Sequence, residues 1–332
     1  MDSETFKIIV LDCLAENYGL SGSLRRLPGE NLNFLLTTWE GQRSVVKIVD
    51  EDMPPEVVEM EIQAIEHAVS RGLSIELPKT IQNFNGKIET GIKIHTKGEY
   101  RLRLIHFIDG KTLDSMTDIS TNLQKNIGKS LAKFNLVMQD FDHPAAHRSH
   151  RWSLAEAGRH RDKTRLVEEA EKRDLLSWAF GTWQQASEEF YLLPQQFIHG
   201  DPNPENILVK GDRVSGLVDF GDSCFNPAIC DLAICLCYLM MDRKDPVETA
   251  SIVSRAYHEV RPLSDAEFSA LFPLVCGRLA VTIAVSTSRR LIDPVNPNWF
   301  GGEADAWRLL ARLRVIGPGT ISRRDQSLSF GL

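Results

Sequence analysis

Residues 197–222, FIHGDPNPENILVKGDRVSGLVDFGD, hold the densest group of side chains that could do chemistry. His199 and Asp201 follow an apolar pair, Asn206 comes five positions after Asp201, and Asp219 opens a D-F-G triplet. The order H-x-D-x-x-x-x-N, strand, turn, strand, D-F-G is typical of phosphoryl-transfer sites, which work by positioning and by neutralising charge. Asp201 is therefore the candidate catalytic carboxylate, placed to receive a hydroxyl proton. His199 is expected to pack against this loop and orient it.

The metal ligands are predicted from the hairpin that follows this loop. Residues 207–209 and 214–218 read as its two strands, and 210–213 as its turn. A turn centred between Asp212 and Arg213 places Asn206 directly opposite Asp219, with Cβ atoms roughly 5 Å apart. An amide oxygen and a carboxylate at that separation suit Mg²⁺, which prefers hard oxygen ligands. We therefore expect Asn206 and Asp219 to bind Mg²⁺.

A lysine in an apolar strand is the candidate phosphate ligand. Lys47 lies in SVVKIV (44–49), and a lysine there is rarely buried without a partner. The next segment begins with Pro54-Pro55 and reads as a helix ending at Gly72. Glu61 lies nearer the apolar stripe of this helix than Glu59 does. We therefore predict a Lys47–Glu61 pair that directs the lysine toward the α- and β-phosphates.

The loop 27–33 precedes the first of two strands, 34–39 and 44–49, which a turn at 40–43 joins. Its position suits a flap over the phosphates of a nucleotide. Gly29 and Asn33 of this loop are the residues that we expect at the nucleotide.

Length and pattern predict two packed units, since 332 residues exceed the usual single domain. Residues 1–106 are mainly strand-like with one inserted helix, and residues 107–332 are mainly helical. The strand within 101–113 runs into Asp109-Gly110, a turn signal that marks the hinge. The N-terminus reads as a short amphipathic helix. The net charge of −7 argues against a general nucleic-acid surface, though not against a local basic nucleotide pocket.

The six cysteines show no paired zinc spacing and are expected to be free, buried thiols, which suits a reducing cytoplasm. No uninterrupted apolar run is long enough to cross a bilayer, so no membrane partner is expected. The richest run, 228–241, is interrupted by Asp231 and reads as a buried core helix. Asp231 needs a hydrogen-bonding partner there. We expect it to tie this helix to residues 199–206, the candidate catalytic loop.

Together these residues resemble the aminoglycoside phosphotransferase family, which includes choline, homoserine and hydroxylysine kinases. The resemblance covers nearly the whole chain. It implies an α+β, bilobal protein-kinase-like fold with a small β-rich N-terminal lobe, a larger mainly helical C-terminal lobe and a nucleotide bound between them. It also implies Asp201 as catalytic carboxylate, Asn206 and Asp219 as Mg²⁺ ligands, and Lys47 as phosphate-binding lysine.

Three segments, 27–36, 216–234 and 271–290, are similar to the hydroxylysine-kinase branch. The branch implies 5-hydroxylysine as first acceptor and, since hydroxylysine kinases are associated with GTP, leaves ATP or GTP as donor. Homoserine, choline, a sugar or an aminoglycoside are alternative acceptors. A non-catalytic nucleotide-binding protein is the other alternative, but it predicts loss of a site residue that this chain retains.

Two departures from related patterns matter. Gly200 stands where H-R-D protein kinases have arginine, and no long activation segment follows Asp219, so a protein kinase is disfavoured. Trp152-Ser153-Leu154 stands where family members often have W-D-L. This chain therefore has serine in place of that aspartate, and whether the aspartate's role in the substrate site or in the structure applies here is open.

The acceptor contacts are the least specified part of the sequence. Asp222 is a candidate for an acceptor amino group or for a second metal ion. An amino-acid carboxylate would need a cation, for which Arg278 is the first candidate, beside Arg289 and Arg290. A choline site would need an aromatic cage, and nothing in the sequence brings its tryptophans together; they are Trp152, Trp299 and Trp307.

Overall fold

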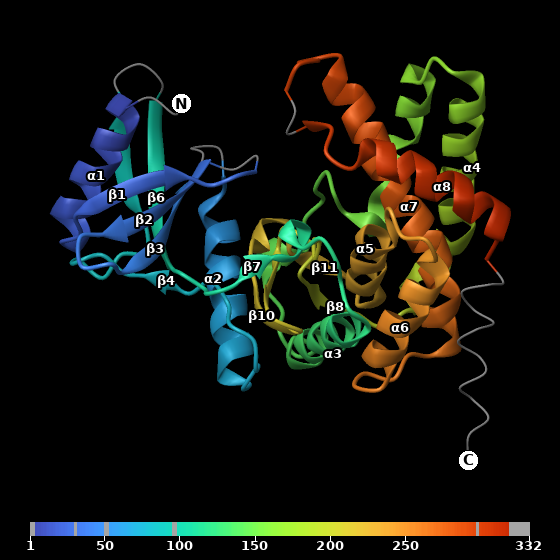
Figure 1. Cartoon of the computed structure of the whole chain (residues 1–332), viewed down its shortest axis with the longest axis horizontal. Helices are drawn as coiled ribbons and strands as arrows, with labels where there is room; N and C mark the ends of the chain where they lie inside the picture. The colour runs from blue at the N-terminus through green and yellow to red at the C-terminus, as the bar shows by residue number, and fades with distance from the viewer. Residues whose placement is uncertain (1–3, 30–31, 50–52, 95–97, 297–298, 319–332) are drawn as a thin grey trace. The chain divides into compact units, whose positions relative to one another are not determined.

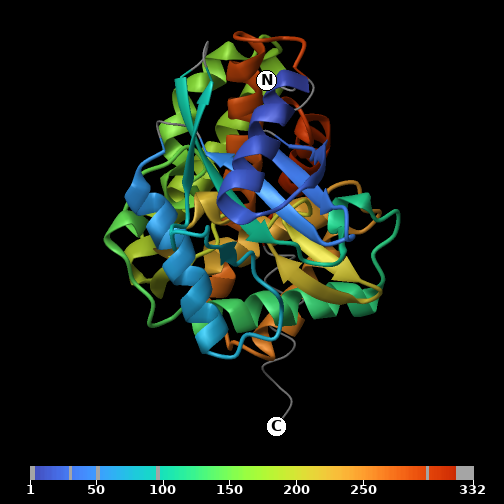
Figure 2. The same ribbon diagram turned by 90° about the vertical axis from the view of Figure 1, so that its left-hand side faces the viewer.

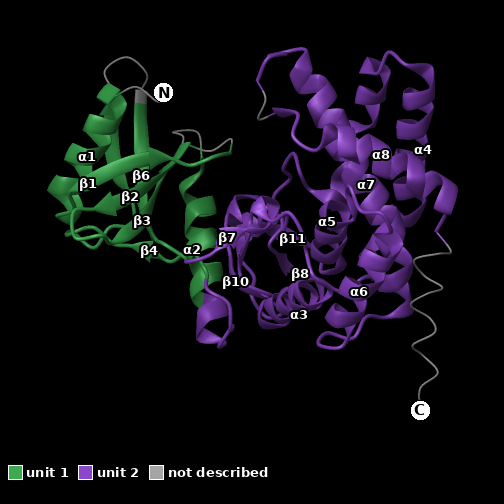
Figure 3. Cartoon of the chain, in the orientation of Figure 1, with its two compact units in different colours: residues 1–66, 77–108 green, residues 67–76, 109–332 purple. Residues whose placement is uncertain are grey.

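The computed structural model describes residues 4–29, 32–49, 53–94, 98–296 and 299–318. The chain forms two compact units, residues 1–66 with 77–108 and residues 67–76 with 109–332 (Figure 3). The change at 108/109 lies just beyond the predicted boundary at 106/107, and the second unit also takes residues 67–76. Each unit is described by itself.

Unit 1 is built on one antiparallel sheet. Its order is β1-β2-β3-β6-β4, and β5 pairs with β6. The strands are β1 (Gly22–Arg26), β2 (Leu32–Thr38), β3 (Arg43–Val49), β4 (Thr80–Ile81), β5 (Thr90–Ile94) and β6 (Gly98–His106). The predicted hairpin is β2–β3, and Gly41 in its turn has a φ of +84°, which glycine adopts without strain. The expectation of paired strands around residues 40–43 is confirmed.

The two faces of this sheet carry different side chains. Helix α1 (Glu4–Tyr18) lies on one face, where Phe6 and Val10 pack with Phe34, Val46 and other apolar residues (Figures 1 and 2). Because successive side chains of a strand point to opposite faces, Lys47 emerges on the face away from α1. The expected N-terminal helix is confirmed.

Helix α2 (Pro55–Ser70) begins and ends where proline and glycine predict. Pro55 opens it. At its end Gly72, with a φ of +76°, donates to the Val69 carbonyl and Leu73 donates to the Ala68 carbonyl, which is a Schellman motif. Residues 67–70 of this helix belong to unit 2.

Unit 2 contains two small sheets that hold the predicted catalytic segment. β7 (Lys111–Thr112), β9 (Ile207–Lys210) and β10 (Arg213–Leu217) form one, and β8 (Gln195–Ile198) pairs with β11 (Cys224–Pro227) in the other. Residues 199–206 therefore connect β8 to β9, and residues 218–223 connect β10 to β11. The two loops with the predicted site residues both run between the same two sheets.

The remainder of unit 2 is helical (Figure 1). Its longest helix, α7, packs against α4, α5, α8 and the 3₁₀ segment Leu154–Leu166. The helices are α3 (Thr121–Val137), α4 (Ala170–Ser187), α5 (Ile229–Met240), α6 (Pro246–His258), α7 (Asp265–Arg290) and α8 (Glu303–Ile316). The sheet-rich first unit and the helical second unit confirm the predicted α+β class.

Helix α7 is long and apolar enough to pass as a membrane span by composition, which the sequence analysis overlooked. However, 83% of its most apolar window is buried inside the protein. It is therefore the core helix of unit 2. All six cysteines are buried and unpaired, which confirms the expected free thiols.

Candidate active site

The loop 199–206 is fixed through Asp231, on α5. The Asp231 Oδ2 atom accepts from the His199 backbone N–H (3.0 Å), and Oδ1 accepts from the Gly200 N–H (2.9 Å). Oδ2 also accepts from the Asn135 side-chain amide (2.8 Å). Burial raises the pKa of Asp231, and the three N–H donors on its two oxygens oppose this shift by stabilising the ionised carboxylate. The predicted tie between this helix and the catalytic loop is confirmed.

His199 is a support for the same loop. Its Nδ1 accepts from the Asp201 backbone N–H (3.2 Å), so Nε2 carries the proton and donates to the Val218 carbonyl (3.0 Å). Burial lowers the pKa of His199, which keeps the imidazole neutral. Both nitrogens are therefore used to join the loop to the strand end at Val218. This confirms the expectation that His199 orients the loop.

Each oxygen of the Asp201 side chain has a partner. Oδ1 accepts from Arg278 Nη2 (2.6 Å). Oδ2 accepts from Asn203 Nδ2 (2.7 Å) and, more weakly, from Asn206 Nδ2 (3.3 Å). The carboxylate is thus held in one orientation by side chains from its own loop and from α7.

Burial raises the pKa of Asp201 to about 7. The Arg278 guanidinium opposes this shift, whereas the carboxylates of Asp222 and Asp219 add to it. A carboxylate with such a pKa suits a general base near neutral pH.

The hairpin register differs from the predicted one. The turn is the pair Gly211-Asp212, and the register shifts between Val214 and Gly216, so the Asn206 carbonyl accepts from the Val218 N–H (2.9 Å). Asn206 therefore lies opposite Val218, and the prediction that it lies directly opposite Asp219 is wrong. A tighter turn and an irregularity at the bulge cause the offset of one residue.

Asp219 follows at the end of the hairpin with a φ of +62°. Positive φ is uncommon outside glycine, and it reverses the backbone direction at this residue. Such left-handed residues persist where the surrounding structure enforces them, often at functional sites. The local backbone thus breaks the strand pattern at the predicted metal ligand.

The chemistry of this loop fits Mg²⁺. The Asn206 amide nitrogen donates to the Asp201 carbonyl (2.9 Å), which leaves the amide oxygen as the atom available to a cation. In the described residues no three His, Cys, Asp or Glu side chains form a metal group of their own. An Asn–Asp pair would need oxygens from a nucleotide phosphate as well, which is the usual setting of Mg²⁺.

The backbone of Gly200 lies close to the backbone carbonyl of Asp222. Gly200 has a φ of +82°, and a Cβ built on it would lie 2.1 Å from the Asp222 carbonyl oxygen. Only glycine fits, which explains why no arginine stands at this position. The Asp222 carboxylate lies 3.6 Å from His150 Nδ1, on the segment before Trp152. A site for an acceptor amino group at Asp222 stays a prediction.

Arg278 has a different setting from the predicted free cation for a substrate. It is 2% exposed and its guanidinium bonds Asp201 and the Tyr238 hydroxyl (3.0 Å). This contact was not predictable from sequence patterns, because Arg278 lies 77 positions along the chain from Asp201.

The structure brings two of the three cage tryptophans together. Arg289 lies against the Trp152 ring (5.7 Å to its centroid) and the Trp299 ring (5.4 Å), while Arg278 lies 5.0 Å from the Trp152 ring. Trp307 instead contacts Lys172 (5.9 Å). The indoles that could surround a choline cation are thus in contact with arginines of the protein itself.

Unit 1 contains a row of polar side chains of its own. Asn33, Lys47 and Arg103 are direct neighbours across β2, β3 and β6. Neighbours in register share a face of the sheet, and the Asn33 Oδ1 atom is buried without a hydrogen-bond partner. On the face of the sheet away from α1, Lys47 and Arg103 are hydrogen-bond donors and the Asn33 amide oxygen is an acceptor.

Glu61 is buried and Glu59 is exposed, so the expected place of Glu61 beside the apolar stripe is confirmed, whereas its pairing with Lys47 stays a prediction. The ion pair of Glu61 is with Arg103, whose Nη1 lies 2.7 Å from Oε2. Arg103 was not among the predicted residues, although the alternation R-L-R-L in β6 indicates that it shares a face of its strand with Arg101. Arg103 is thus an unforeseen partner for the carboxylate that was predicted to serve Lys47.

The loop 27–33 is closed at its base by Leu27 N–H donating to the Asn33 carbonyl (2.9 Å). Arg26 folds back onto it and donates to the Leu27 (2.7 Å) and Asn33 (3.0 Å) carbonyls. Gly29 has a φ of +105°, and Glu30 and Asn31 lie outside the described residues. The role of Gly29 and Asn33 at a nucleotide stays a prediction.

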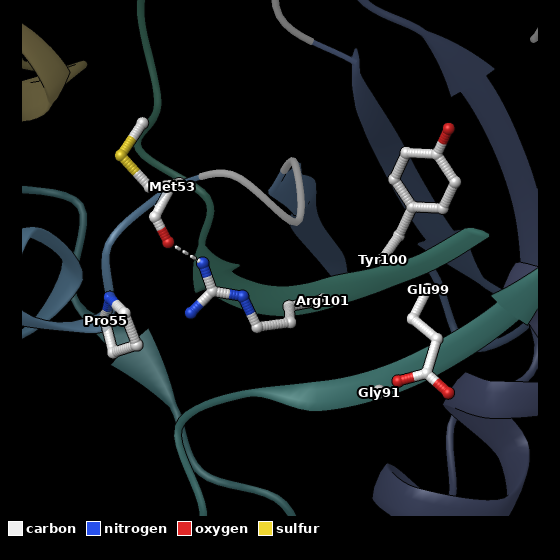
Figure 4. A pocket seen from close by; sticks show the side chains of 6 residues that line it. All are labelled: Met53, Pro55, Gly91, Glu99, Tyr100 and Arg101. Atoms are coloured by element: carbon white, nitrogen blue, oxygen red, sulfur yellow. Dashed lines mark hydrogen bonds between the residues drawn. The ribbon is translucent and has the colours of Figure 1, made fainter. Parts of the chain in front are cut away.

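Unit 1 also contains a pocket of about 260 Å³. It is lined by Met53, Pro55, Gly91, Glu99, Tyr100 and Arg101. Arg101 points at the Met53 carbonyl, to which it donates, and also bonds Glu89 (3.0 Å) (Figure 4). Its guanidinium is engaged by the protein, and none of the predicted site residues lines the pocket.

Comparison with known proteins places these features in context. The family model described as "Phosphotransferase enzyme family" matches residues 23–267. That range contains the predicted catalytic, metal-binding and nucleotide-binding residues, and the candidate acceptor arginines Arg278, Arg289 and Arg290 lie beyond it.

Two curated relatives have similar lengths. Hydroxylysine kinase from Danio rerio is 25% identical over 95% of this chain and 93% of its own length. Homoserine kinase from Gluconobacter oxydans is 29% identical over 83% of this chain and 82% of its own length.

Among solved structures, the amicoumacin kinase hAmiN, in complex with AMP-PNP, Ca²⁺ and Ami, is similar with a TM-score of 0.72. It is 16% identical, and the alignment covers 94% of this chain and 96% of hAmiN. The likeness confirms the predicted protein-kinase-like fold.

Proposed function

Because this chain belongs to the phosphotransferase enzyme family, we propose that it transfers the γ-phosphoryl group of ATP or GTP to the hydroxyl of a small amino or hydroxy metabolite. The chain is a small-molecule kinase. Its proposed acceptor is 5-hydroxylysine, and homoserine is the alternative with the most support.

The observation that carries the proposal is the setting of Asp201. Its carboxylate is oriented through both oxygens, lies mostly out of water, and has a pKa raised by burial to about 7. It is placed on a loop whose backbone Asp231 fixes. A base so positioned can accept the proton of a hydroxyl as that oxygen attacks phosphorus.

The remaining residues would hold the donor. Asn206 and Asp219 would bind Mg²⁺ together with phosphate oxygens, and Mg²⁺, when bound, supplies positive charge to the transferred phosphoryl group. Lys47, with Asn33 beside it, would contact the phosphates, and Glu61 with Arg103 would brace that face of the sheet. Gly29 would let the loop 27–33 approach the nucleotide closely.

Two considerations support a hydroxy amino acid as acceptor. Both relatives are named for amino acids that carry a side-chain hydroxyl, and the hydroxylysine kinase is similar over nearly all of both chains. Asp222 offers a carboxylate for an acceptor amino group, about 30% exposed beside the catalytic loop. A choline acceptor has less support, because the paired indoles contact arginines.

The test is a phosphoryl-transfer assay with Mg²⁺, either ATP or GTP, and a panel of acceptors. The panel holds 5-hydroxylysine, homoserine, choline, a sugar and an aminoglycoside, and product is identified by mass and ³¹P NMR. We expect 5-hydroxylysine turnover that Asp201→Asn abolishes while nucleotide binding remains. Preferential turnover of homoserine would correct the acceptor, and full activity of Asp201→Asn would refute the proposed base.

The proposed compartment is the cytoplasm, since six free thiols suit a reducing environment. No nucleic acid or membrane is a proposed partner, because the net charge is −7 and the long apolar helix is the core of unit 2.

A further inference from the structure

We infer that Arg278 is a positioning residue for Asp201 and not a ligand of the acceptor's carboxylate. This inference rests on the proposed function, because it concerns the base of that reaction. It also identifies the oxygen of Asp201 that meets the acceptor hydroxyl.

All three guanidinium nitrogens of Arg278 are engaged inside the protein. Nη2 donates to Asp201 Oδ1 (2.6 Å) and to the Tyr238 hydroxyl (3.0 Å), Nε to the same hydroxyl (3.3 Å), and Nη1 to the Trp152 carbonyl (3.4 Å). The group also lies 5.0 Å from the Trp152 ring and 5.4 Å from the Tyr238 ring. Binding a substrate carboxylate would break these contacts in a side chain that is 2% exposed.

Two helices, α5 and α7, hold Asp201 in place. Asp231 and Tyr238 are seven residues apart on α5, so they share a face of that helix. Asp231 fixes the backbone of the catalytic loop. Tyr238 holds Arg278, on α7, which fixes the carboxylate. The backbone and the side chain of the base are thus held by α5 and α7, which pack against each other.

Counting lone pairs selects the reactive oxygen. An ionised carboxylate has about four acceptor positions, two on each oxygen. Oδ2 already accepts from Asn203 and Asn206, whereas Oδ1 accepts from Arg278. The open position is on Oδ1. The acceptor hydroxyl therefore donates to Oδ1, next to the Arg278 guanidinium, Tyr238 and Trp152.

The test compares Arg278→Lys and Tyr238→Phe with a matched control, Arg261→Lys. Arg261 is also a buried arginine of unit 2, paired with Glu267 at 2.8 Å and lying 5.9 Å from a tyrosine ring. If Arg278 positions the base, Arg278→Lys lowers kcat about 100-fold, because a lysine cannot hold the carboxylate in place. Tyr238→Phe lowers kcat about tenfold. Arg261→Lys lowers the melting temperature and leaves kcat unchanged.

A split between kcat and KM separates positioning from substrate binding. Each variant is assayed with an acceptor that has a carboxylate and with the matching amino alcohol that lacks it. We expect kcat to fall equally for both, with acceptor KM and nucleotide Kd within about threefold of wild type. A rise in KM confined to the carboxylate-bearing acceptor would overturn the inference and make Arg278 an acceptor ligand.

Rescue gives a readout that a merely structural role would not produce. Arg278→Ala leaves space for a guanidinium ion beside Asp201 Oδ1, so millimolar guanidinium should restore part of kcat, and equal concentrations of sodium or ethylammonium should not. If Arg278→Ala does not fold, Arg278→Lys and Tyr238→Phe still decide the matter, since wild-type kcat in both overturns the inference.

Asp201→Asn separates the two levels of failure. If that variant is inactive while Arg278→Lys has wild-type kcat, the positioning role fails and the proposed function stands. If Asp201→Asn keeps wild-type turnover, the proposed base itself fails and the inference falls with it.

Discussion

Asp231 lies 0% exposed within unit 2, so its replacement is the most informative single change in the scaffold of the site. In Asp231→Asn, an amide oxygen at the Oδ2 position keeps the bonds from His199 and Asn135. The amide nitrogen then takes the place of Oδ1 and faces the Gly200 N–H. Both groups are donors, so the hydrogen bond from Gly200 is lost.

The expected loss of stability follows from the hydrogen bonds that are lost or weakened. Leaving a buried N–H unsatisfied costs about 1–3 kcal/mol, and changing the two remaining bonds from charge-assisted to neutral costs about 1 kcal/mol each. We therefore expect Asp231→Asn to lower the free energy of unfolding by about 3–5 kcal/mol. Because the Gly200 peptide directly precedes Asp201, kcat should also fall by about 10- to 100-fold.

The assay pairs urea denaturation with steady-state kinetics. All tryptophans except Trp39 belong to unit 2, so their fluorescence follows the unfolding of that unit. Glu267→Gln is the matched control. Glu267 is a buried carboxylate that accepts from Arg261 and caps α7 through Ser264, and it makes no hydrogen bond to the described loop 199–206.

We expect Glu267→Gln to destabilise unit 2 and to keep kcat. If both variants lose stability and neither loses kcat, Asp231 supports the fold without positioning the base, and the reasoning is refuted. Unchanged stability of Asp231→Asn would refute the count of hydrogen bonds itself.

Four further predictions follow from the geometry. Gly200→Ala should inactivate the enzyme, because its Cβ would lie 2.1 Å from the Asp222 carbonyl oxygen; wild-type kcat in this variant would contradict the loop geometry. Since burial raises the pKa of Asp201 to about 7 and the base must be ionised, kcat/KM for the acceptor should fall tenfold per pH unit below about pH 7. An acidic limb near pH 4 would show that bound cations outweigh burial. Arg103→Met should lower the free energy of unfolding by about 3–5 kcal/mol by leaving Glu61 unpaired, and adding Glu61→Leu should restore much of it in urea titrations. Chelation of Mg²⁺ should stop turnover, and Asp219→Asn should raise the Mg²⁺ concentration needed for half-maximal rate.

Local patterns were enough for the parts of the site that lie close together in the chain. His199, Asp201 and Asn206 belong to one loop, and the hairpin after it follows from alternation and turn residues. The helix α2 was predictable from Pro55 and Gly72, and the buried state of Glu61 from its place on the helical wheel.

The register of the hairpin β9–β10 could not be predicted from the sequence pattern. The turn Gly211-Asp212 is compatible with the sequence, but so is a longer one, and the shift between Val214 and Gly216 depends on packing. The observed register differs from the predicted one by one residue, so Asn206 lies opposite Val218 and not opposite Asp219. The hydrogen bond from the Val218 N–H to the Asn206 carbonyl shows this.

The sequence by itself determined which residues are the candidates for the chemistry, because a short loop keeps them close together whatever surrounds it. Only the tertiary structure decided their partners. Arg278 reaches Asp201 from 77 positions away, and Arg103 reaches Glu61 from 42. Periodicity tells from which face of a helix or strand a side chain emerges. It cannot tell which distant segment packs there, because that choice is made by the burial of the whole core and by the need to pair every buried charge.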